Sequence, residues 1–114
     1  MTDPDVPPKR IFSYAEAAAL LPEVRRVTEE AHHRVETLGE AAAGGSAPPD
    51  AQARIDEIVT EWAQAIIEKG VEVKGPWLVD FDNGSGYYCW RYPETGLHFF
   101  HSYEDGFRGR MPIQ

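Results

Sequence analysis

The stretch of sequence that decides the fold is YYCWRYPETGLHFFHSYEDGFRGRMPI, residues 87–113. It holds most of the aromatic residues, the only cysteine and two of the four histidines. Aromatic residues favour strands, and Pro-Glu-Thr-Gly at 93–96 is typical of a turn, as is Asp-Asn-Gly-Ser-Gly at 82–86. We therefore predict a three-stranded antiparallel β-meander with strands at 78–81, 87–92 and 97–102. A glycine-rich tail follows and ends at residues 111–113.

Helices are predicted before this meander. Ser13 and Glu16 have the spacing of a capping box, so a helix should begin at residue 14. Pro22 lacks an N–H group and disfavours a helical residue before it. This predicts a short helix over 14–20 and a separate long helix over 22–43.

A second long helix is predicted at 51–69. The glycines and prolines of residues 44–49 indicate a turn before it, and Gly70 is expected to terminate it. Because only a short turn separates the two long helices, they should pair antiparallel.

The predicted fold class is α+β: a long antiparallel helical hairpin, preceded by a short helix and followed by a small three-stranded antiparallel β-meander. A flexible tail is expected at 1–12 and a single domain at 13–114. Within that domain the helices occupy 13–43 and 51–70, and the meander with its tail occupies 71–114.

The helix at 51–69 carries a wide apolar stripe that includes Ile55, Ile58, Trp62 and Ile66. A stripe of this width requires more than one neighbour to bury it. The second neighbour is either the sheet or another subunit. We therefore expect a homodimer formed through the helices, in a four-helix arrangement.

The composition of the chain argues against several classes of binding partner. The chain has 114 residues and a formal net charge of −8, which argues against nucleic acid or an anionic membrane as partner. No apolar run reaches the length of a spanning helix, and no signal peptide is evident. A single cysteine cannot form an internal disulfide or a multi-cysteine zinc site. We expect a cytoplasmic protein.

Several short motifs along the chain form a recognisable pattern. They are the segments 12–17, 20–25, 70–74, 79–81, 89–91, 101, 106–107, 109–110 and 112–113. In these segments the chain resembles the bacterial family named domain of unknown function twenty-two-oh-three, although Pro93 and Phe100 depart from its pattern. The resemblance implies a helical hairpin with a small sheet and a cytosolic bacterial origin, and it implies no known activity.

A divalent metal is one candidate ligand. His101 and Glu104 are three residues apart and could bind a metal together, with His98 as a further ligand. Strand alternation argues against joint ligation by the two histidines, because it places them on opposite faces. The structural alternative is a histidine that hydrogen-bonds a neighbouring carboxylate.

Anion binding and thiol chemistry are further candidates. Arg110 could bind a carboxylate or phosphate within a glycine-rich loop, or pair with Glu104 or Asp105 instead. Cys89 could be a nucleophile if Arg91, on the same strand face, lowers its pKa; otherwise it is a small core residue.

Two functions remain open. The leading hypothesis is a non-enzymatic binding or assembly module that self-associates through its helical hairpin. The alternative is a small-molecule or metal-dependent enzyme with a site at the end of the meander. That site would use Arg91, His101, Glu104 and Arg110.

Overall fold

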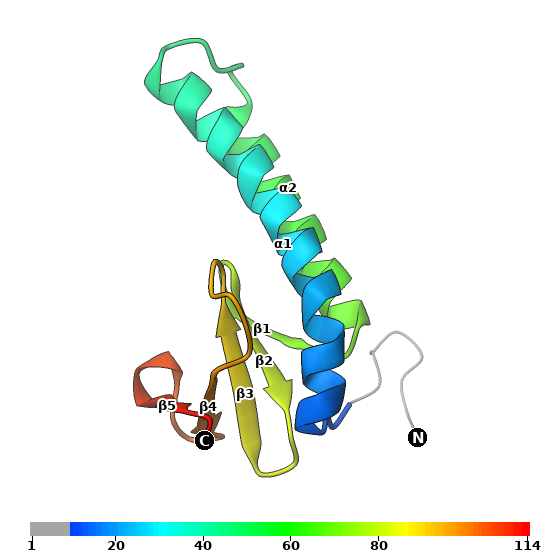
Figure 1. The fold of residues 1–114 in the computed structure, drawn as a ribbon. Coiled ribbons are helices and arrows are strands. Elements are labelled where there is room, and N and C mark those ends of the chain that lie inside the picture. Colours follow the sequence, from blue (N-terminus) through cyan, green and yellow to red (C-terminus); the bar gives the residue numbers. More distant parts are fainter. Residues whose placement is uncertain (1–9) are drawn as a thin grey trace.

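The computed structural model describes residues 10–114. Helices α1 (Tyr14–Ala43) and α2 (Ala51–Glu68) form a hairpin, and the rest of the chain forms one antiparallel sheet beside it (Figure 1). The sheet has five strands, so the predicted three-stranded meander is wrong, whereas the α+β class holds. The strands lie in chain order: β1 (Glu72–Gly75), β2 (Leu78–Asp82), β3 (Gly86–Arg91), β4 (Phe99–Ser102) and β5 (Met111–Pro112).

The two strands that were not predicted are the outer ones. β1 joins β2 through a tight turn in which Trp77 has a positive φ of 64°. β5 has only two residues, and Pro112 cannot donate a hydrogen bond to a sheet, which confines proline to sheet edges. A strand of two residues lacks the run of alternating residues that reveals a strand in a sequence.

Helix α1 is continuous through Pro22, so the predicted separate short helix is wrong. The predicted capping box is present: the Glu16 N–H donates to Ser13 Oγ at 3.1 Å, and the Ser13 N–H donates to Glu16 Oε1 at 2.9 Å. The buried face continues across the proline, from Leu21 to Val24. Pro22 itself is exposed, so water can bind the helix carbonyl that its missing N–H leaves free. Burial of the continuous face offsets the lost hydrogen bond.

The two helices are joined by a buried hydrogen-bond relay. Trp62 Nε1 donates to Thr28 Oγ1 at 2.8 Å, and Thr28 Oγ1 donates to the Val24 carbonyl at 2.7 Å. Thr28 and Trp62 are both buried. The relay therefore satisfies two polar groups inside the hairpin and sets how α2 lies against α1.

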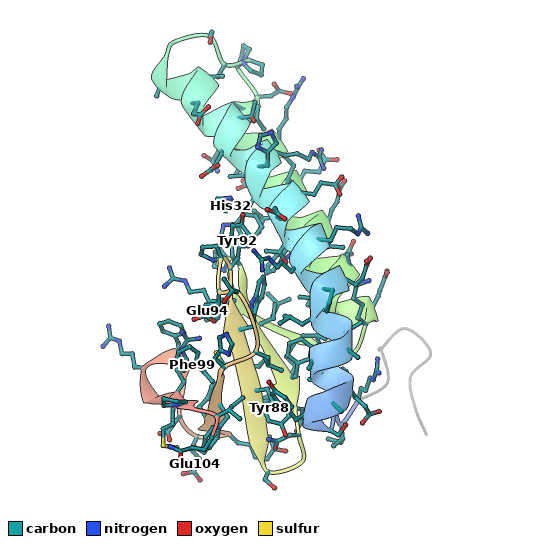
Figure 2. The ribbon with its side chains drawn as sticks, viewed as in Figure 1. His32, Tyr88, Tyr92, Glu94, Phe99 and Glu104 are labelled. Carbon is teal, nitrogen blue, oxygen red and sulfur yellow. The ribbon has the colours of Figure 1, made fainter. Side chains whose placement is uncertain are left out.

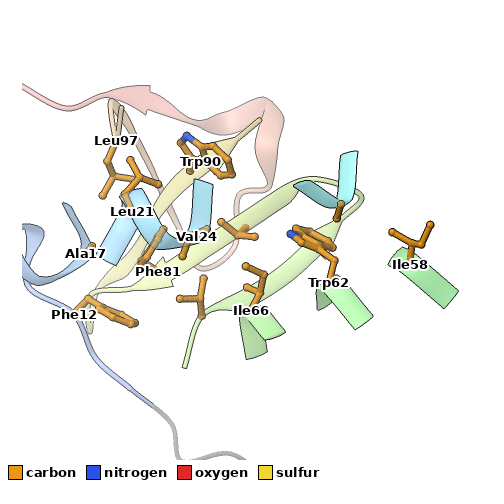
Figure 3. Packing of buried hydrophobic residues seen from close by; sticks show 13 residues of the cluster. Phe12, Ala17, Leu21, Val24, Ile58, Trp62, Ile66, Phe81, Trp90 and Leu97 are labelled. Carbon is orange, nitrogen blue, oxygen red and sulfur yellow. The ribbon is translucent and has the colours of Figure 1, made fainter. Parts of the chain in front are cut away.

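The inner face of the sheet packs on the half of the hairpin nearest the sheet. Val79, Phe81 and Trp90 are fully buried there, together with Val24 and Ile66 of the helices (Figure 3). The other half of the hairpin projects beyond the sheet (Figure 1). The sheet thus covers only part of the apolar surface between the helices.

The segment before α1 joins the sheet. Phe12 is buried, its ring meets that of Phe81 edge-on at 5.3 Å, and its N–H donates to the Asp82 carbonyl at 2.7 Å. The expected flexible tail covered residues 1–12, of which residues 1–9 lie outside the described part of the chain. In the part that is described, no helix is long and apolar enough to cross a membrane.

Candidate metal centre

Three buried side chains with metal-binding atoms meet on the sheet face that points away from the helices. Asp80 of β2 lies opposite Cys89 of β3, and His101 belongs to the next strand, β4. Because side chains alternate along a strand, Asp80 faces away from the core residues Val79 and Phe81. One ligand atom from each of the three residues lies within 4.8 Å of the other two.

The C-terminal segment between β4 and β5 covers this face in place of a helix. Its first turn is held by Ser102 Oγ, which accepts from the Asp105 N–H at 3.1 Å and donates to Asp105 Oδ2 at 3.0 Å. A 3₁₀ turn, η1 (Phe107–Gly109), follows. A Cβ at Gly109 would lie 2.7 Å from the Asp105 Cβ, so this close approach favours glycine. The segment is therefore tightly folded, and it forms one wall of the outer face.

Both ring nitrogens of His101 are engaged. Nδ1 lies 2.8 Å from the Ser102 carbonyl oxygen, and Nε2 lies 3.0 Å from Asp80 Oδ2. A carbonyl oxygen only accepts hydrogen bonds, so Nδ1 carries a proton. One further proton then lies between His101 Nε2 and the Asp80 carboxylate, bound to one or the other. A metal ion that takes the place of this proton would find the lone pair of Nε2 aimed at it.

Of the three clustered side chains, Asp80 has the buried polar atom with the poorest hydrogen bonding. It is 2% exposed, and no hydrogen bond of standard geometry reaches its Oδ1 within the described chain. Burial raises the pKa of Asp80, and the neighbouring His101 and a weak hydrogen bond with the Cys89 thiol oppose that rise. A buried carboxylate oxygen without a well-aligned donor is unfavourable, and a cation is one group that would satisfy it.

Cys89 does not have the environment of a catalytic nucleophile. Burial raises the pKa of its thiol to about 12, although Arg110 Nη1 lies 3.7 Å from Sγ and opposes the rise. His101 cannot act as its base, because both of its ring nitrogens have other partners. A bound metal ion would instead hold the sulfur as thiolate.

A cavity of about 390 Å³ opens onto the cluster. Asp80, Cys89 and His101 all line it, and the covering segment contributes Tyr103 and Glu104. Tyr103 donates from its hydroxyl to Asp82 Oδ1 at 2.6 Å, and this hydrogen bond raises the Tyr103 pKa to about 12.

Arg110 belongs to an ion pair that the sequence did not predict. Its guanidinium forms two hydrogen bonds to the Glu94 carboxylate and does not pair with Glu104 or Asp105. The same group lies over the rings of Phe99 and Phe107, 4.0 and 4.3 Å from their centroids. Arg110 is therefore held by one acid and two aromatic rings.

The other predicted site residues are dispersed. Arg91 is exposed and lies over the Phe107 ring at 5.4 Å, while Glu104 is exposed on the wall of the cavity. Figure 2 shows Glu94, Phe99 and Glu104 on the side of the sheet away from the helices. His98 is exposed and lines a different cavity, beside Tyr14 and Tyr88. Of the predicted ligands, His101 alone joins the three-residue cluster.

Comparison with known proteins identifies a family. The family model described as Uncharacterized conserved protein (DUF2203) matches residues 10–113. The chain belongs to this family. No curated protein and no solved structure matches it. The DUF2203 description assigns no activity, so the function is argued from the geometry of the site.

Sequence reasoning missed two residues of this candidate site, Asp80 and Glu94. Asp80 interrupts the apolar run from Leu78 to Phe81, and alternation alone would have placed it on the outer face with Cys89. That signal was available in the sequence. Glu94 lies in a turn, and no pattern in the sequence indicates that it meets Arg110.

Proposed function

We propose that the protein binds one transition-metal ion through Asp80, Cys89 and His101. The observation that carries this proposal is the buried Asp80 Oδ1, which receives no hydrogen bond of standard geometry and lies beside a thiol and an imidazole. In a tetrahedral zinc centre the ligand atoms are about 3.3–3.8 Å apart. The cluster, within 4.8 Å, therefore needs only small side-chain movements to reach that geometry.

The three types of ligand atom determine which class of metal ion the cluster suits. One thiolate, one imidazole and one carboxylate suit Zn²⁺ or Co²⁺, whereas Mg²⁺ and Ca²⁺ prefer oxygen ligands alone. The Nδ1 hydrogen bond of His101 to the Ser102 carbonyl provides the outer contact that usually orients a metal-binding histidine. We place the protein in the cytoplasm, where a reducing environment keeps a thiolate ligand available.

Metal titration tests the proposal. Chelator-treated protein should bind one equivalent of Zn²⁺ or Co²⁺, measured by calorimetry and by metal analysis after desalting. Cys89→Ser and His101→Gln should each weaken binding by about tenfold or more, because each removes one ligand. His98→Gln is the matched control, since His98 is exposed and lies outside the cluster.

Two results would contradict the metal centre. One is a chelator-treated protein that binds neither ion with a Kd below about 10 μM. The other is an affinity that Cys89→Ser and His98→Gln change equally. Circular dichroism on each variant shows whether the fold is retained, so that lost binding is not confused with lost structure.

We also propose that two copies of the chain associate through the projecting half of the hairpin. A groove of about 440 Å³ runs there between the helices and contains the apolar side chains of Leu38 and Ile58. Its rim carries Arg34, paired with Glu61, and Arg54, paired with Asp50, and these exposed pairs can exchange partners with a second copy of the chain. The expected product is a four-helix bundle.

Light scattering tests this association. The protein should be a dimer at micromolar concentration, and Leu38→Gln should shift it towards monomer by removing apolar surface from the groove. Glu40→Gln is the control, because Glu40 is exposed and outside the groove. A monomeric native protein would rule out this interface.

A further inference from the structure

The metal centre has too few protein ligands to enclose an ion. Structural zinc sites use four protein ligands, whereas catalytic sites use three and leave one position for water or substrate. Within the described chain, no fourth histidine, cysteine or acidic residue joins the group of Asp80, Cys89 and His101. A tetrahedral ion held there keeps one position for a ligand from outside the protein.

The cavity lies where that position would open. It is lined by all three residues of the cluster, and its volume of about 390 Å³ falls within the range of small-molecule pockets, about 300–1,000 Å³. Tyr87, Tyr103 and Phe107 contribute aromatic walls. The cavity therefore has room for a small molecule beside the three buried residues.

Some charged side chains around the cavity have an ion-pair partner and others do not. Lys74 lines the cavity and its Nζ lies 3.0 Å from Glu72 Oε1, and Arg110 beside the cavity is paired with Glu94. Two further acids line the cavity and form no ion pair with any described residue: Asp105, which accepts from Ser102 Oγ, and Glu104. The unpaired charge on the cavity wall is therefore negative, and it favours a ligand that brings a positive group.

We propose that the metal ion keeps one coordination position open to this cavity and that the position takes a small amino-acid-like molecule. Its carboxylate binds the ion, and its ammonium group faces Glu104. This inference rests on the metal centre proposed above and adds the class of ligand to it. The thiolate and the Asp80 carboxylate neutralise a divalent ion, so the centre accepts one further weak oxygen donor.

Two matched compounds test the ligand class. 4-Aminobutyrate and butyrate have the same chain and carboxylate and differ by one ammonium group. Both should change the visible spectrum of the Co²⁺-loaded protein, because both reach the open position. 4-Aminobutyrate should bind about two- to fivefold more tightly, the range expected for a partly exposed ion pair. Glu104→Gln should remove that preference and leave the affinity for butyrate unchanged.

The outcomes separate the two proposals. If the protein binds cobalt but neither compound changes its spectrum, the open position is refuted and the metal centre stands. If the two compounds bind equally, or the preference survives Glu104→Gln, the role of Glu104 is refuted. A protein that binds no cobalt would instead refute the metal centre itself. Because Glu104 is exposed, its replacement leaves the buried structure intact.

Discussion

Replacing Thr28 with valine tests the relay that joins the two helices. Valine has nearly the shape of threonine, so the substitution leaves no cavity, but it removes the hydroxyl that accepts from Trp62 Nε1. Val24 keeps a backbone helix bond, so its carbonyl is not left unsatisfied. The change therefore leaves one buried donor, the indole N–H, without a partner.

The magnitude follows from burial. Trp62 is 2% exposed, so water does not replace the lost acceptor, and an unsatisfied buried group costs about 1–3 kcal/mol. Thr28→Ser keeps the hydroxyl and loses one methyl group, which is worth about 1 kcal/mol. Thr28→Val should therefore destabilise the protein at least as much as Thr28→Ser, although it retains more apolar surface.

Urea unfolding followed by tryptophan fluorescence measures the effect. With a slope of about 2 kcal/mol per molar, a loss of 2 kcal/mol lowers the midpoint by about 1 M. Thr37→Val is the matched control, because Thr37 Oγ1 makes the same bond to a carbonyl one turn earlier, His33, on an exposed face. It should change stability by less than about 0.5 kcal/mol. Equal effects of Thr28→Val and Thr37→Val would refute the reasoning.

Three other predictions concern the outer face. With a thiol pKa near 12, Cys89 in the metal-free native protein should react with a disulfide reagent at least about 100-fold more slowly than in urea, and equal rates would contradict its burial. The folded state holds the Tyr103 proton more tightly than the unfolded state, so this group's stabilisation is lost as pH rises from about 10 through about 12. Tyr103→Phe should reduce that loss in urea titrations at successive pH values; an unchanged pH profile would argue against the bond to Asp82. Arg110→Lys should cost about 1–2 kcal/mol in urea, because lysine cannot form two parallel bonds to Glu94, and a neutral result would show that the pair contributes little.

The sequence predicted the elements whose signals are local. The capping box at Ser13 and strands β2, β3 and β4 follow from residues close together in the chain. Pro22 was misjudged because the penalty for an internal proline is local, whereas the compensation comes from packing of a helix face against α2 and the sheet. A rule about neighbouring residues cannot weigh burial that a distant segment provides.

Local signals likewise indicated some residues of the candidate site and not others. His101 could be singled out as a metal-binding residue type, but its partner is Asp80, 21 residues earlier, and the register of two strand pairs brings them together. Arg110 likewise meets Glu94 rather than its acidic neighbours in the sequence. Proximity in the chain suggested the wrong partners, because strand pairing rather than spacing sets which side chains meet.

The strand order of the sheet also determines how the chain can assemble. Each strand pairs with the one before it in the sequence, and the helices form a hairpin of their own, so most tertiary contacts join segments close in the chain. Topologies with local contacts close small loops and reach their native pairing quickly. One exception is Phe12, whose backbone bond to Asp82 spans 70 residues and encloses both helices. With the bond from the Tyr14 hydroxyl to the Leu97 carbonyl, at 3.0 Å, it ties the start of the chain to the sheet, so the strand that carries Asp80 is fixed only when both ends of the fold have met.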